Sequence, residues 1–467
     1  MKKGVLFLLM MLLFLVSASG NIGQVQAADD LVINEENFPA EWLRNLLKTK
    51  YYDLDGNGVL SGHEIEEIKI VQNYLSFPEN YISNAWSMGW PYTGATSAAI
   101  ISGTDLSGKD ALDTRGLEKL VFCERLNLAE ITCEKFTISS CPELLTIIQL
   151  ANADINVLEV AGESIQSVYF PNYAPVDALG GADGIGWRHN DEIPPASGIV
   201  PEPVNHVRQL DVSRCPNLRI LECDSPTLTT VDVRQNKELE QLSCEGNQLT
   251  ELDVSNNTKL ERLRCGYNQL AKLDLRQNRQ LKLIYAKDNQ LTSLDISKLT
   301  ELLKLDVREN QLKKLDVSKN KKLSRLVCKK NQLKKLDLSK NKKLGWVSCR
   351  QNKIKTLVLS DINWRKDTSN EEYTVHGQYY YSLFGQNPVN MLDLRTVSDF
   401  RRFKKKTVLQ FMTGEYNWWE EEANYYKEKQ IPLRKIKKLV ISRKLSGSDR
   451  SWLTKQAKKN KVKIVYK

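Results

Sequence analysis

The segment Leu252 to Leu270 reads LDVSNNTKLERLRCGYNQL and recurs along the chain at a fixed interval. The residue that opens the segment lies 21 residues from its counterpart in each neighbouring copy, giving the series Leu210, Val231, Leu252, Leu273, Leu294, Leu315, Leu336 and Leu357. No copy departs from this spacing, and only the last copy replaces the following Asp, with Val358. Self-similarity at a fixed period of this length predicts a repeat solenoid, in which each repeat forms one coil.

The second half of each copy indicates which side chains face the interior. Leu260 to Leu270 fits the leucine-rich-repeat template L-x-x-L-x-L-x-x-N-x-L, with Cys265 at the third apolar place. One coil cannot bury these residues until neighbouring coils stack above and below it. The Asn of the template recurs as Asn247, Asn268, Asn289, Asn310, Asn331 and Asn352. A stacked row of amides can satisfy the backbone groups that a tight turn leaves unpaired. Both long sides of the coil look extended, so we predict a mainly β, gently curved solenoid.

The place of Cys265 is filled by small or medium apolar residues in the other coils: Cys223, Cys244, Ala286, Val307, Cys328 and Cys349. Disulfides between neighbouring coils are the alternative for an exported protein. Strands that are parallel and in register point their Cβ atoms the same way, however, which is poor disulfide geometry. We therefore expect free, buried thiols that fill the core.

This pattern resembles the leucine-rich repeats of internalin-like bacterial surface proteins, in particular the short-repeat type with a cysteine ladder and an L-D-V-S-x-N segment. The resemblance covers residues 207–362 and implies a role in adhesion. Upstream, Phe136 to Leu144 matches Leu210 to Leu218 more weakly. We assign the upstream ranges as a linker leading into the solenoid (76–116), degenerate leucine-rich repeats (117–161) and an inserted loop rich in Gly, Pro and aromatic residues (162–206).

The N-terminus has the features of a secretory signal peptide. Lys2 and Lys3 precede an apolar run from Val5 to Val16, and Val25-Gln26-Ala27 offers small residues to a signal peptidase. The run is shorter than the roughly 20 residues that span a membrane. We expect residues 1–27 to be removed and the mature chain to be secreted. The absence of a wall-sorting motif near Lys467 distinguishes the chain from anchored internalins.

The segment Asp53 to Glu64 fits the twelve-residue EF-hand loop at every coordinating position. The expected Ca²⁺ ligands are the side chains of Asp53, Asp55, Asn57 and Glu64, the Val59 carbonyl, and Ser61 through a water. Residues 39–50 have helical spacing before the loop, and Ile65 with Ile68 begins a second helix. A solvated acidic turn is the alternative. We predict an EF-hand-like helical cap over residues 31–75, stabilised by Ca²⁺, an arrangement similar to that of other secreted leucine-rich-repeat proteins of Gram-positive bacteria.

The outward positions of the Cys-containing strand vary from coil to coil, as a recognition surface requires. One such row is Asp224, Glu245, Gly266, Lys287, Arg308, Lys329 and Arg350. The candidate ligand-binding residues on this face are Arg262, Arg264, Tyr267, Tyr285, Lys287, Asp306, Arg308 and Trp346. The alternative is solvated surface without a ligand. On the other side of the coil, seven Asp residues from Asp211 to Asp337 share one position, which argues for a structural role, with Lys272, Lys314 and Lys335 screening their charges.

Positive charge is concentrated in the C-terminal half. Residues 301–350 hold 16 Lys and Arg against 5 Asp and Glu, and residues 401–467 hold 20 against 6. The three interpretations, in order of preference, are an ordinary solvated face, a patch for anionic wall polymers or sulfated glycans, and a nucleic-acid surface. For a secreted chain we expect no nucleic-acid partner.

Residues 363–467 leave the repeat and carry aromatic clusters at Tyr379 to Tyr381 and at Trp418-Trp419. The end of this range predicts a strand over 439–441, a helix over 448–459 capped by Ser448, and a strand over 462–466. We expect a small α/β domain that closes the open end of the solenoid.

The motifs favour a binding protein over an enzyme. The four histidines, His63, His189, His206 and His376, form no metal-binding pair, and no nucleophile elbow is present. The leading hypothesis is a secreted binding or adhesion protein, without enzymatic activity, that recognises a protein or glycan. A secreted carbohydrate-active enzyme is the alternative, because paired carboxylates need only meet in space, in the insert or the C-terminal domain. A structural role in an extracellular matrix is a third hypothesis.

Overall fold

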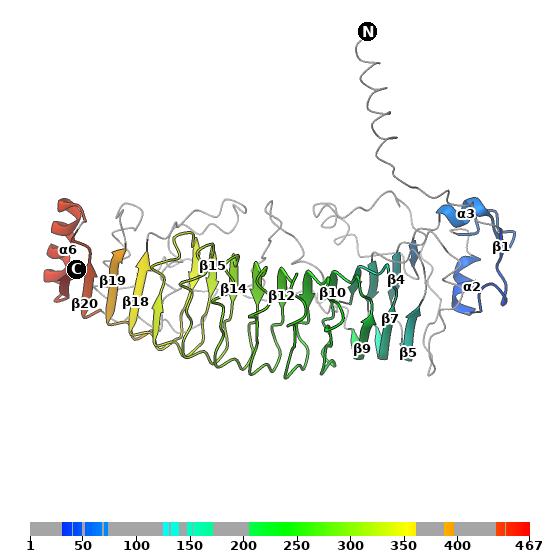
Figure 1. The fold of residues 1–467 in the computed structure, drawn as a ribbon, viewed down its shortest axis with the longest axis horizontal. Helices are drawn as coiled ribbons and strands as arrows, with labels where there is room; N and C mark the ends of the chain where they lie inside the picture. The colour runs from blue at the N-terminus through cyan, green and yellow to red at the C-terminus, as the bar shows by residue number, and fades with distance from the viewer. Residues whose placement is uncertain are drawn as a thin grey trace, which may run out of the picture.

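The computed structural model describes residues 30–39, 41–48, 52–67, 70–72, 125–129, 132–139, 147–151, 153–170, 205–360, 387–396, 436–443 and 445–467. The signal peptide (1–27), the linker (76–116), most of the insert (162–206) and the aromatic clusters at 379–381 and 418–419 lie outside these residues. The described part is long and only slightly curved, with short helices at both ends (Figure 1).

A long parallel sheet runs the length of the molecule. Its strands, in spatial order, are β17 (Trp346–Ser348), β15 (Arg325–Val327), β14 (Lys304–Asp306), β13 (Leu283–Tyr285), β12 (Arg262–Arg264), β11 (Gln241–Ser243), β10 (Ile220–Glu222), β8 (Ser167–Tyr169), β6 (Ile147–Ala151), β4 (Arg125–Ala129) and β3 (Ile70–Gln72). From β10 to β17 each strand pairs with residues 21 positions away, as Leu242 does with Leu263. The predicted solenoid of leucine-rich-repeat coils is therefore confirmed.

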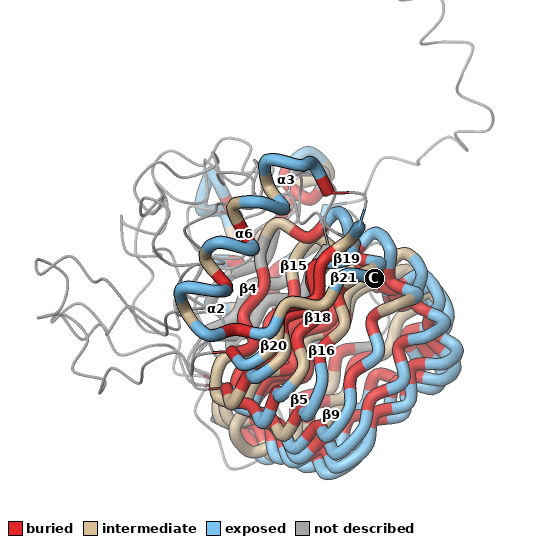
Figure 2. Tube along the Cα trace, turned by 90° about the vertical axis from the view of Figure 1, so that its left-hand side faces the viewer, coloured by how far each residue is buried: buried red, intermediate tan, exposed pale blue. Residues whose placement is uncertain are grey.

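The second side of the coil forms strands only toward its ends, within the described residues. One group is β5 (Thr132–Ser139), β7 (Asp154–Ala161) and β9 (His206–Arg214). The other is β16 (Lys335–Asp337), β18 (Thr356–Ser360), β19 (Met391–Thr396), β20 (Lys438–Ile441) and β21 (Lys463–Tyr466). Viewed along the solenoid, buried positions recur from coil to coil and exposed ones gather at the outer edge (Figure 2).

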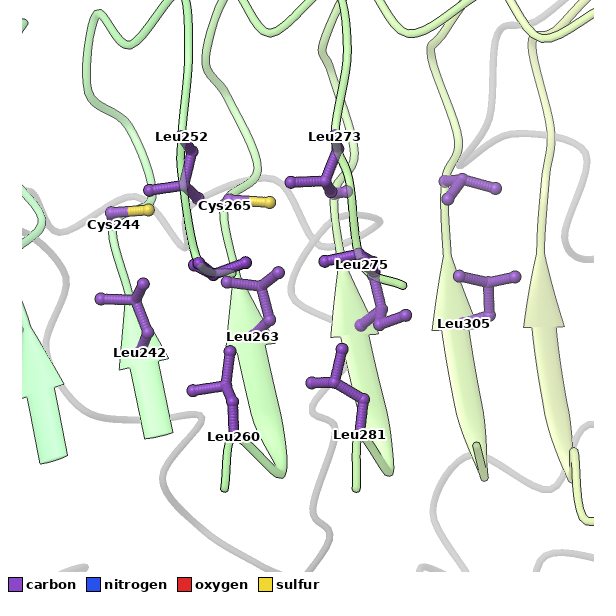
Figure 3. Packing of buried hydrophobic residues seen from close by; sticks show 14 of the residues in the cluster. Leu242, Cys244, Leu252, Leu260, Leu263, Cys265, Leu273, Leu275, Leu281 and Leu305 are labelled. Atoms are coloured by element: carbon purple, nitrogen blue, oxygen red, sulfur yellow. The ribbon is translucent and has the colours of Figure 1, made fainter. Parts of the chain in front are cut away.

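The interior is filled by the apolar residues of the template. Leu260, Leu263, Cys265 and Leu270 are completely buried, and the equivalent leucines of neighbouring coils pack against them (Figure 3). Burying one such leucine stabilises the fold by about 1.5–3 kcal/mol. All seven described cysteines are buried and free, as expected for core filler. Burial raises the pKa of the Cys265 thiol well above its usual range, which keeps the thiol protonated and unreactive.

Each coil is joined to its neighbours by the predicted asparagine row. The Asn268 Nδ2 donates to the carbonyl oxygens of Cys244 (2.8 Å) and Gly266 (3.0 Å), and its Oδ1 accepts from the Leu249 N–H (2.9 Å). The residue before each of these asparagines has a positive φ: Gly246, Tyr267, Asp288, Glu309, Lys330 and Gln351. Only one of the six is glycine, although this backbone region is costly for other residues. The asparagine bonds therefore hold a turn that the local sequence does not favour.

A second asparagine row, which the sequence analysis did not identify, joins the other turn of the coil. The Asn257 Nδ2 donates to the carbonyl oxygens of Val233 (2.9 Å) and Asn236 (2.8 Å). The row comprises Asn236, Asn257, Asn278, Asn320 and Asn341, all completely buried. Cys215 and Leu299 take the same place in two other coils. The 21-residue spacing of these asparagines in the sequence could have predicted this second row.

The seven aspartates that share one coil position have a structural role, as predicted. Their recurring contact is a hydrogen bond to the backbone, whereas the sequence analysis expected lysines to screen their charges. The Asp253 Oδ1 accepts the backbone N–H of Ser255 at 2.9 Å, and the same bond to the residue two positions on recurs in the other coils. These bonds lower the pKa of Asp253, which favours the ionised carboxylate. Of the three predicted screening lysines, Lys335 forms a described ion pair, with Asp337 at 3.3 Å.

The C-terminal region continues the solenoid sheet. Leu357 of β18 pairs with Leu392 of β19, which pairs with Leu439 of β20, and α6 (Gly447–Lys459) connects β20 to β21. The predicted strand, helix and strand are thus present. The predicted N-cap, Ser448, is wrong. Ser446 caps α6, because its Oγ accepts the Asp449 N–H at 3.2 Å while Ser448 already lies within the first turn.

The N-terminal end is formed by β1 (Leu31–Val32), α2 (Glu41–Leu47), β2 (Val59–Leu60) and α3 (Gly62–Glu67). Both helices are short, and α2 is shorter than the helix expected over 39–50. Three residues after α3 ends, β3 already belongs to the long sheet, inside the range assigned to the cap. Likewise β8 lies inside the range assigned to the insert.

We predict that Asn289→Ala lowers the free energy of unfolding by about 1–3 kcal/mol, because it leaves the buried Leu270 N–H without its acceptor and removes one of the two amide donors to the Cys265 carbonyl, the other being Asn268. Urea denaturation followed by circular dichroism measures the change. Gln290→Ala, at the exposed neighbouring position, is the matched control and should behave as the wild type. Equal stability of the two variants would show that the asparagine row does not hold the coils together.

Candidate functional site

The strand register places the outward residues of several coils in continuous rows on the long sheet. One row is Glu222, Ser243, Arg264, Tyr285, Asp306, Val327 and Ser348. Neighbouring strands lie about 4.8 Å apart, so side chains that are 21 residues apart in sequence become direct neighbours. The sheet can therefore assemble a site from residues of different coils.

Six of the eight predicted ligand-binding residues meet in one place, which we call the Tyr285 cluster: Arg264, Tyr267, Tyr285, Lys287, Asp306 and Arg308. The Lys287 Nζ lies 4.2 Å from the centre of the Tyr267 ring and 4.7 Å from that of Tyr285. The guanidinium groups of Arg264 and Arg308 lie 5.7 and 5.9 Å from the Tyr285 ring. Three cations thus surround one aromatic ring at distances typical of cation–π attraction.

Exposure within the Tyr285 cluster is uneven. Tyr285, Lys287 and Asp306 are buried, whereas Tyr267 is 39% exposed and the Arg264 side chain 32%. The expectation of an open surface therefore applies to Tyr267 and Arg264 and not to the three buried residues, whose side chains pack against their neighbours in the rows. Arg262 is half-buried beside Leu283. Trp346 lies three strands from Tyr285, in β17, and its side chain is outside the described part of the chain.

An acidic cluster, Glu222, Asp224 and Glu245, adjoins the Tyr285 cluster and was not singled out from the sequence. The Asp224 Oδ1 accepts from the Ser243 Oγ and from the Glu245 N–H, both at 2.8 Å. The Glu245 Oε2 accepts from the Arg264 guanidinium at 2.8 Å. The sequence feature that could have predicted the acidic cluster is the change from acidic to basic residues along the row from Asp224 to Arg350.

Burial shifts the pKa values of both clusters. It raises the pKa of Asp224 to about 7, with the nearby Glu222 adding to the effect, and it raises the pKa of Glu245 to about 7 against the opposing influence of Arg264. Burial also raises the pKa of Asp306 to about 7 and lowers that of Arg308 to about 10. The strand face thus holds carboxyl groups that can change charge near neutral pH.

The N-terminal loop brings three of its predicted ligands together. Asp53, Asp55 and Glu64 each offer a carboxylate oxygen, and these oxygens lie within 4.8 Å of one another. Gly56 and Gly58 have positive φ values of 71° and 79°, which permit the sharp turn. Asp53 and Glu64 are buried, and such an all-oxygen donor set suits a hard cation.

Hydrogen bonds within the loop fix its shape. The Asp53 Oδ2 accepts the Gly58 N–H at 2.8 Å, and the Glu64 Oε2 accepts from the Ser61 Oγ at 2.7 Å. The Asn57 Nδ2 donates to the Asp55 Oδ2 at 2.7 Å, so this amide already contacts a neighbouring ligand position. Val59 pairs with Val32 in the β1–β2 ladder. The residues present fit a calcium loop.

No protein-family model and no curated protein matches the chain. Among solved structures, the functional domain of InlJ from Listeria monocytogenes, described as including a cysteine ladder, is 17% identical, with a TM-score of 0.41 over 90% of this chain and 83% of that chain. The internalin InlF of the same organism is 16% identical, with a TM-score of 0.41 over 82% and 96% of the two chains. A leucine-rich-repeat protein of Leptospira interrogans is 16% identical, with a TM-score of 0.32 over 77% and 94%.

This chain is a leucine-rich-repeat solenoid. That statement rests on its own strand register and asparagine rows. Within the described ranges, no helix has the length and apolar character needed to cross a membrane.

We predict that stability falls as the pH rises from 5 to 8. Unfolded Asp and Glu titrate near 4, so between about pH 4 and 7 the folded state, with raised pKa values for Asp224 and Glu245, binds more protons than the unfolded state. Asp224→Asn is neutral at every pH and should flatten this slope, with a larger gain in stability at pH 8 than at pH 5. Urea denaturation at four pH values tests this.

The control for this experiment is Asp253→Asn, because the pKa of the exposed Asp253 is lowered and its titration is complete below pH 5. The control should keep the wild-type slope between pH 5 and 8. An unchanged slope in Asp224→Asn would mean that this carboxyl group titrates at its ordinary pKa.

Proposed function

We propose that this chain is a secreted binding protein that recognises an extracellular protein or glycan through the strand face of its solenoid. The observation that carries the proposal is the Tyr285 cluster, in which residues from three coils converge on one aromatic ring. The interior positions repeat from coil to coil because they stabilise the fold, whereas the outward positions do not repeat. A surface free to vary on a rigid scaffold is suited to recognition.

The residue types of the cluster support this proposal. Tyr and Arg supply much of the binding energy in protein interfaces, because each combines a large contact area with hydrogen-bonding groups. Arg308 also donates to the Tyr285 hydroxyl at 3.1 Å, which orients the ring. The repeat pattern, which resembles that of internalin-like surface proteins, agrees with a role in adhesion. Retention on an anionic wall polymer through the basic C-terminal half is part of the same proposal.

The enzyme alternative has no supporting observation in the described residues. It requires a site in 162–206 or 363–467, and most of both ranges lies outside the described structure. The absence of enzymatic activity and the secretion of the chain both stay predictions.

We further propose that Ca²⁺ binds the N-terminal loop and stabilises that end of the solenoid. Asp53, Asp55, Asn57, Val59, Ser61 and Glu64 would hold the ion in the EF-hand manner. The geometry that supports this is the convergence of three carboxylates around two glycines with positive φ. Because α3 leads within three residues into β3, an ion that fixes Glu64 also fixes the approach to the edge strand of the long sheet.

We predict that Ca²⁺ raises the melting temperature and that Glu64→Gln abolishes the effect, because one bidentate ligand is lost. At a Ca²⁺ concentration one hundred times the dissociation constant, binding adds about 2.7 kcal/mol to the stability of the part that binds it. Thermal unfolding with Ca²⁺ and with a chelator measures the shift. Glu36→Gln, an exposed position outside the loop, should respond to Ca²⁺ as the wild type does. No shift in the wild type at millimolar Ca²⁺ would disprove a calcium site.

We predict that the purified chain binds at least one member of an array of extracellular proteins, neutral and sulfated glycans and wall polymers in a manner that survives high salt. Tyr285→Ala should weaken that binding at least tenfold, because it removes the ring on which the three cations converge. Arg276→Ala, on the opposite side of the coil where Arg276 pairs with Asp274, is the matched control. Binding only to polyanions, and its complete loss at high salt, would contradict the proposal.

A further inference from the structure

Exposed lysines form a row along the C-terminal half of the solenoid, at the turn that leads from the long sheet to the second side of the coil. Lys313, Lys334 and Lys355 occupy one coil position. Backbone hydrogen bonds extend the row into the C-terminal region, because the Lys355 carbonyl accepts the Asn390 N–H at 3.1 Å and the Asn390 carbonyl accepts the Lys437 N–H at 2.9 Å. These five residues, all exposed, are the lysine row. The strands that follow the last three, β18, β19 and β20, lie side by side (Figure 1).

The next position along the chain forms a second, partly basic row. Strand pairing aligns Lys335, Thr356, Met391, Lys438 and Lys463, and Lys314 precedes them by one coil. Neither row contains an acidic residue from Lys313 onward. The aspartates nearby have other partners, since Asp337 pairs with Lys335 at 3.3 Å and Asp393 pairs with Arg395 at 2.6 Å.

Other exposed lysines of the solenoid pair with a glutamate of the neighbouring coil. The Lys282 Nζ lies 2.6 Å from the Glu261 Oε1, and the same 21-residue pairing joins Lys259 to Glu238, Lys322 to Glu301 and Lys330 to Glu309. Within the described part of the chain, no side chain of the lysine row takes part in an ion pair or a hydrogen bond. The protein therefore neutralises stacked charges elsewhere and leaves this row positive.

The fold does not require lysine at this position. The earlier coils carry exposed neutral residues there, namely Thr229, Thr250, Ala271 and Thr292. Like charges one strand apart repel each other, so three consecutive lysines lower stability. An anionic ligand along the row would remove that repulsion.

We infer that the lysine row binds a linear phosphodiester polymer without bases, such as a polyol phosphate, that lies along the solenoid axis. This inference rests on the proposed function, because it assigns a site and a chemical class to the retention on an anionic polymer. The row spans four strand steps, about 19 Å. A partner that neutralises all four lysines must therefore be extended along the axis and carry charge along its whole length.

The side chains present favour this polymer over other polyanions. Neither row from Lys313 onward contains an aromatic residue or an arginine. Single-stranded nucleic acids depend on aromatic side chains that stack on the bases, whereas lysine acts on phosphate as a point charge. The sulfates of a glycan project sideways from the sugar rings, but the phosphates of a phosphodiester chain follow one line, as the lysines do.

The test is calorimetric titration of the full mature chain with poly(glycerol phosphate) at several salt concentrations. The logarithm of the affinity should fall with the logarithm of the salt concentration with a slope of about −3, because each of four neutralised lysines contributes about −0.7. Single-stranded polydeoxythymidine and dextran sulfate with the same number of charges are the comparisons. Tighter binding of either one would overturn the assignment of the polymer.

Variants locate the site. Lys334→Gln combined with Lys355→Gln should weaken binding about tenfold and reduce the slope by about 1.4. Lys259→Gln combined with Lys322→Gln removes the same charge at positions that glutamates neutralise, and should bind as the wild type does. Equal losses in both double variants would show a diffuse attraction by net charge and overturn the inference. Circular dichroism melting confirms that each variant is folded.

Tyr285→Ala separates the lysine row from the proposed recognition face. This variant should bind poly(glycerol phosphate) as the wild type does, because Tyr285 lies on the long sheet, outside both lysine rows. Loss of polymer binding in Tyr285→Ala would place the polymer on the strand face and overturn the inference. If the polymer fails to bind while a protein or glycan still binds in a salt-resistant manner, the inference falls and the proposed function stands.

Discussion

The buried amide of one asparagine in each coil sets the register on which the rest of the structure depends. Asn289, for example, donates to the Cys265 carbonyl of the preceding coil and accepts from the Leu270 N–H, so its side chain ties two coils together at a fixed height. The second row, with Asn257, also joins two coils at the other turn, but only through its donating Nδ2, because the buried Asn257 Oδ1 accepts no hydrogen bond. A coil held at both turns cannot slip against its neighbour without leaving several buried polar groups unpaired, which is costly.

Because the register is fixed by inward-facing residues, the residues that stabilise the fold differ from those proposed to bind a partner. The leucines, cysteines and asparagines that hold the coils together all point inward, so the outward positions can change without loss of the fold. The Tyr285 cluster and the acidic cluster use that freedom, because their members lie 21 residues apart in sequence and one strand apart in space. Their charges are desolvated by burial, which raises the pKa of Asp306 to about 7 and lowers that of Arg308 to about 10.

Features that repeat with the period could be predicted, and features that depend on contacts between non-periodic segments could not. The 21-residue spacing predicted the parallel sheet and the row of asparagines that includes Asn268. It also predicted that cysteines such as Cys265 are free thiols in the core. The strands β3, β8 and β19 join the same sheets across long insertions that break the spacing, so periodicity could not place them. The acidic cluster was missed because Asp224 and Glu245 look like ordinary surface residues until burial and the unpaired Glu245 oxygen are known. Ser446 and Ser448 are both residues of a type that caps helices and lie two positions apart, so only the geometry selects Ser446 over the predicted Ser448.

The central claim, that a constant 21-residue register stacks the coils one strand apart, is tested most directly by distances between spin labels. Labels introduced as a non-canonical amino acid at Gln209 and at Ser293, Lys314 or Lys335 lie four, five and six coils apart at exposed positions. Pulsed electron paramagnetic resonance should give narrow distributions that lengthen by about 4.8 Å with each added coil, from roughly 19 to 29 Å between backbone positions. Broad distributions, or steps that differ from coil to coil, would contradict a fixed register and with it the rows from which both clusters are built.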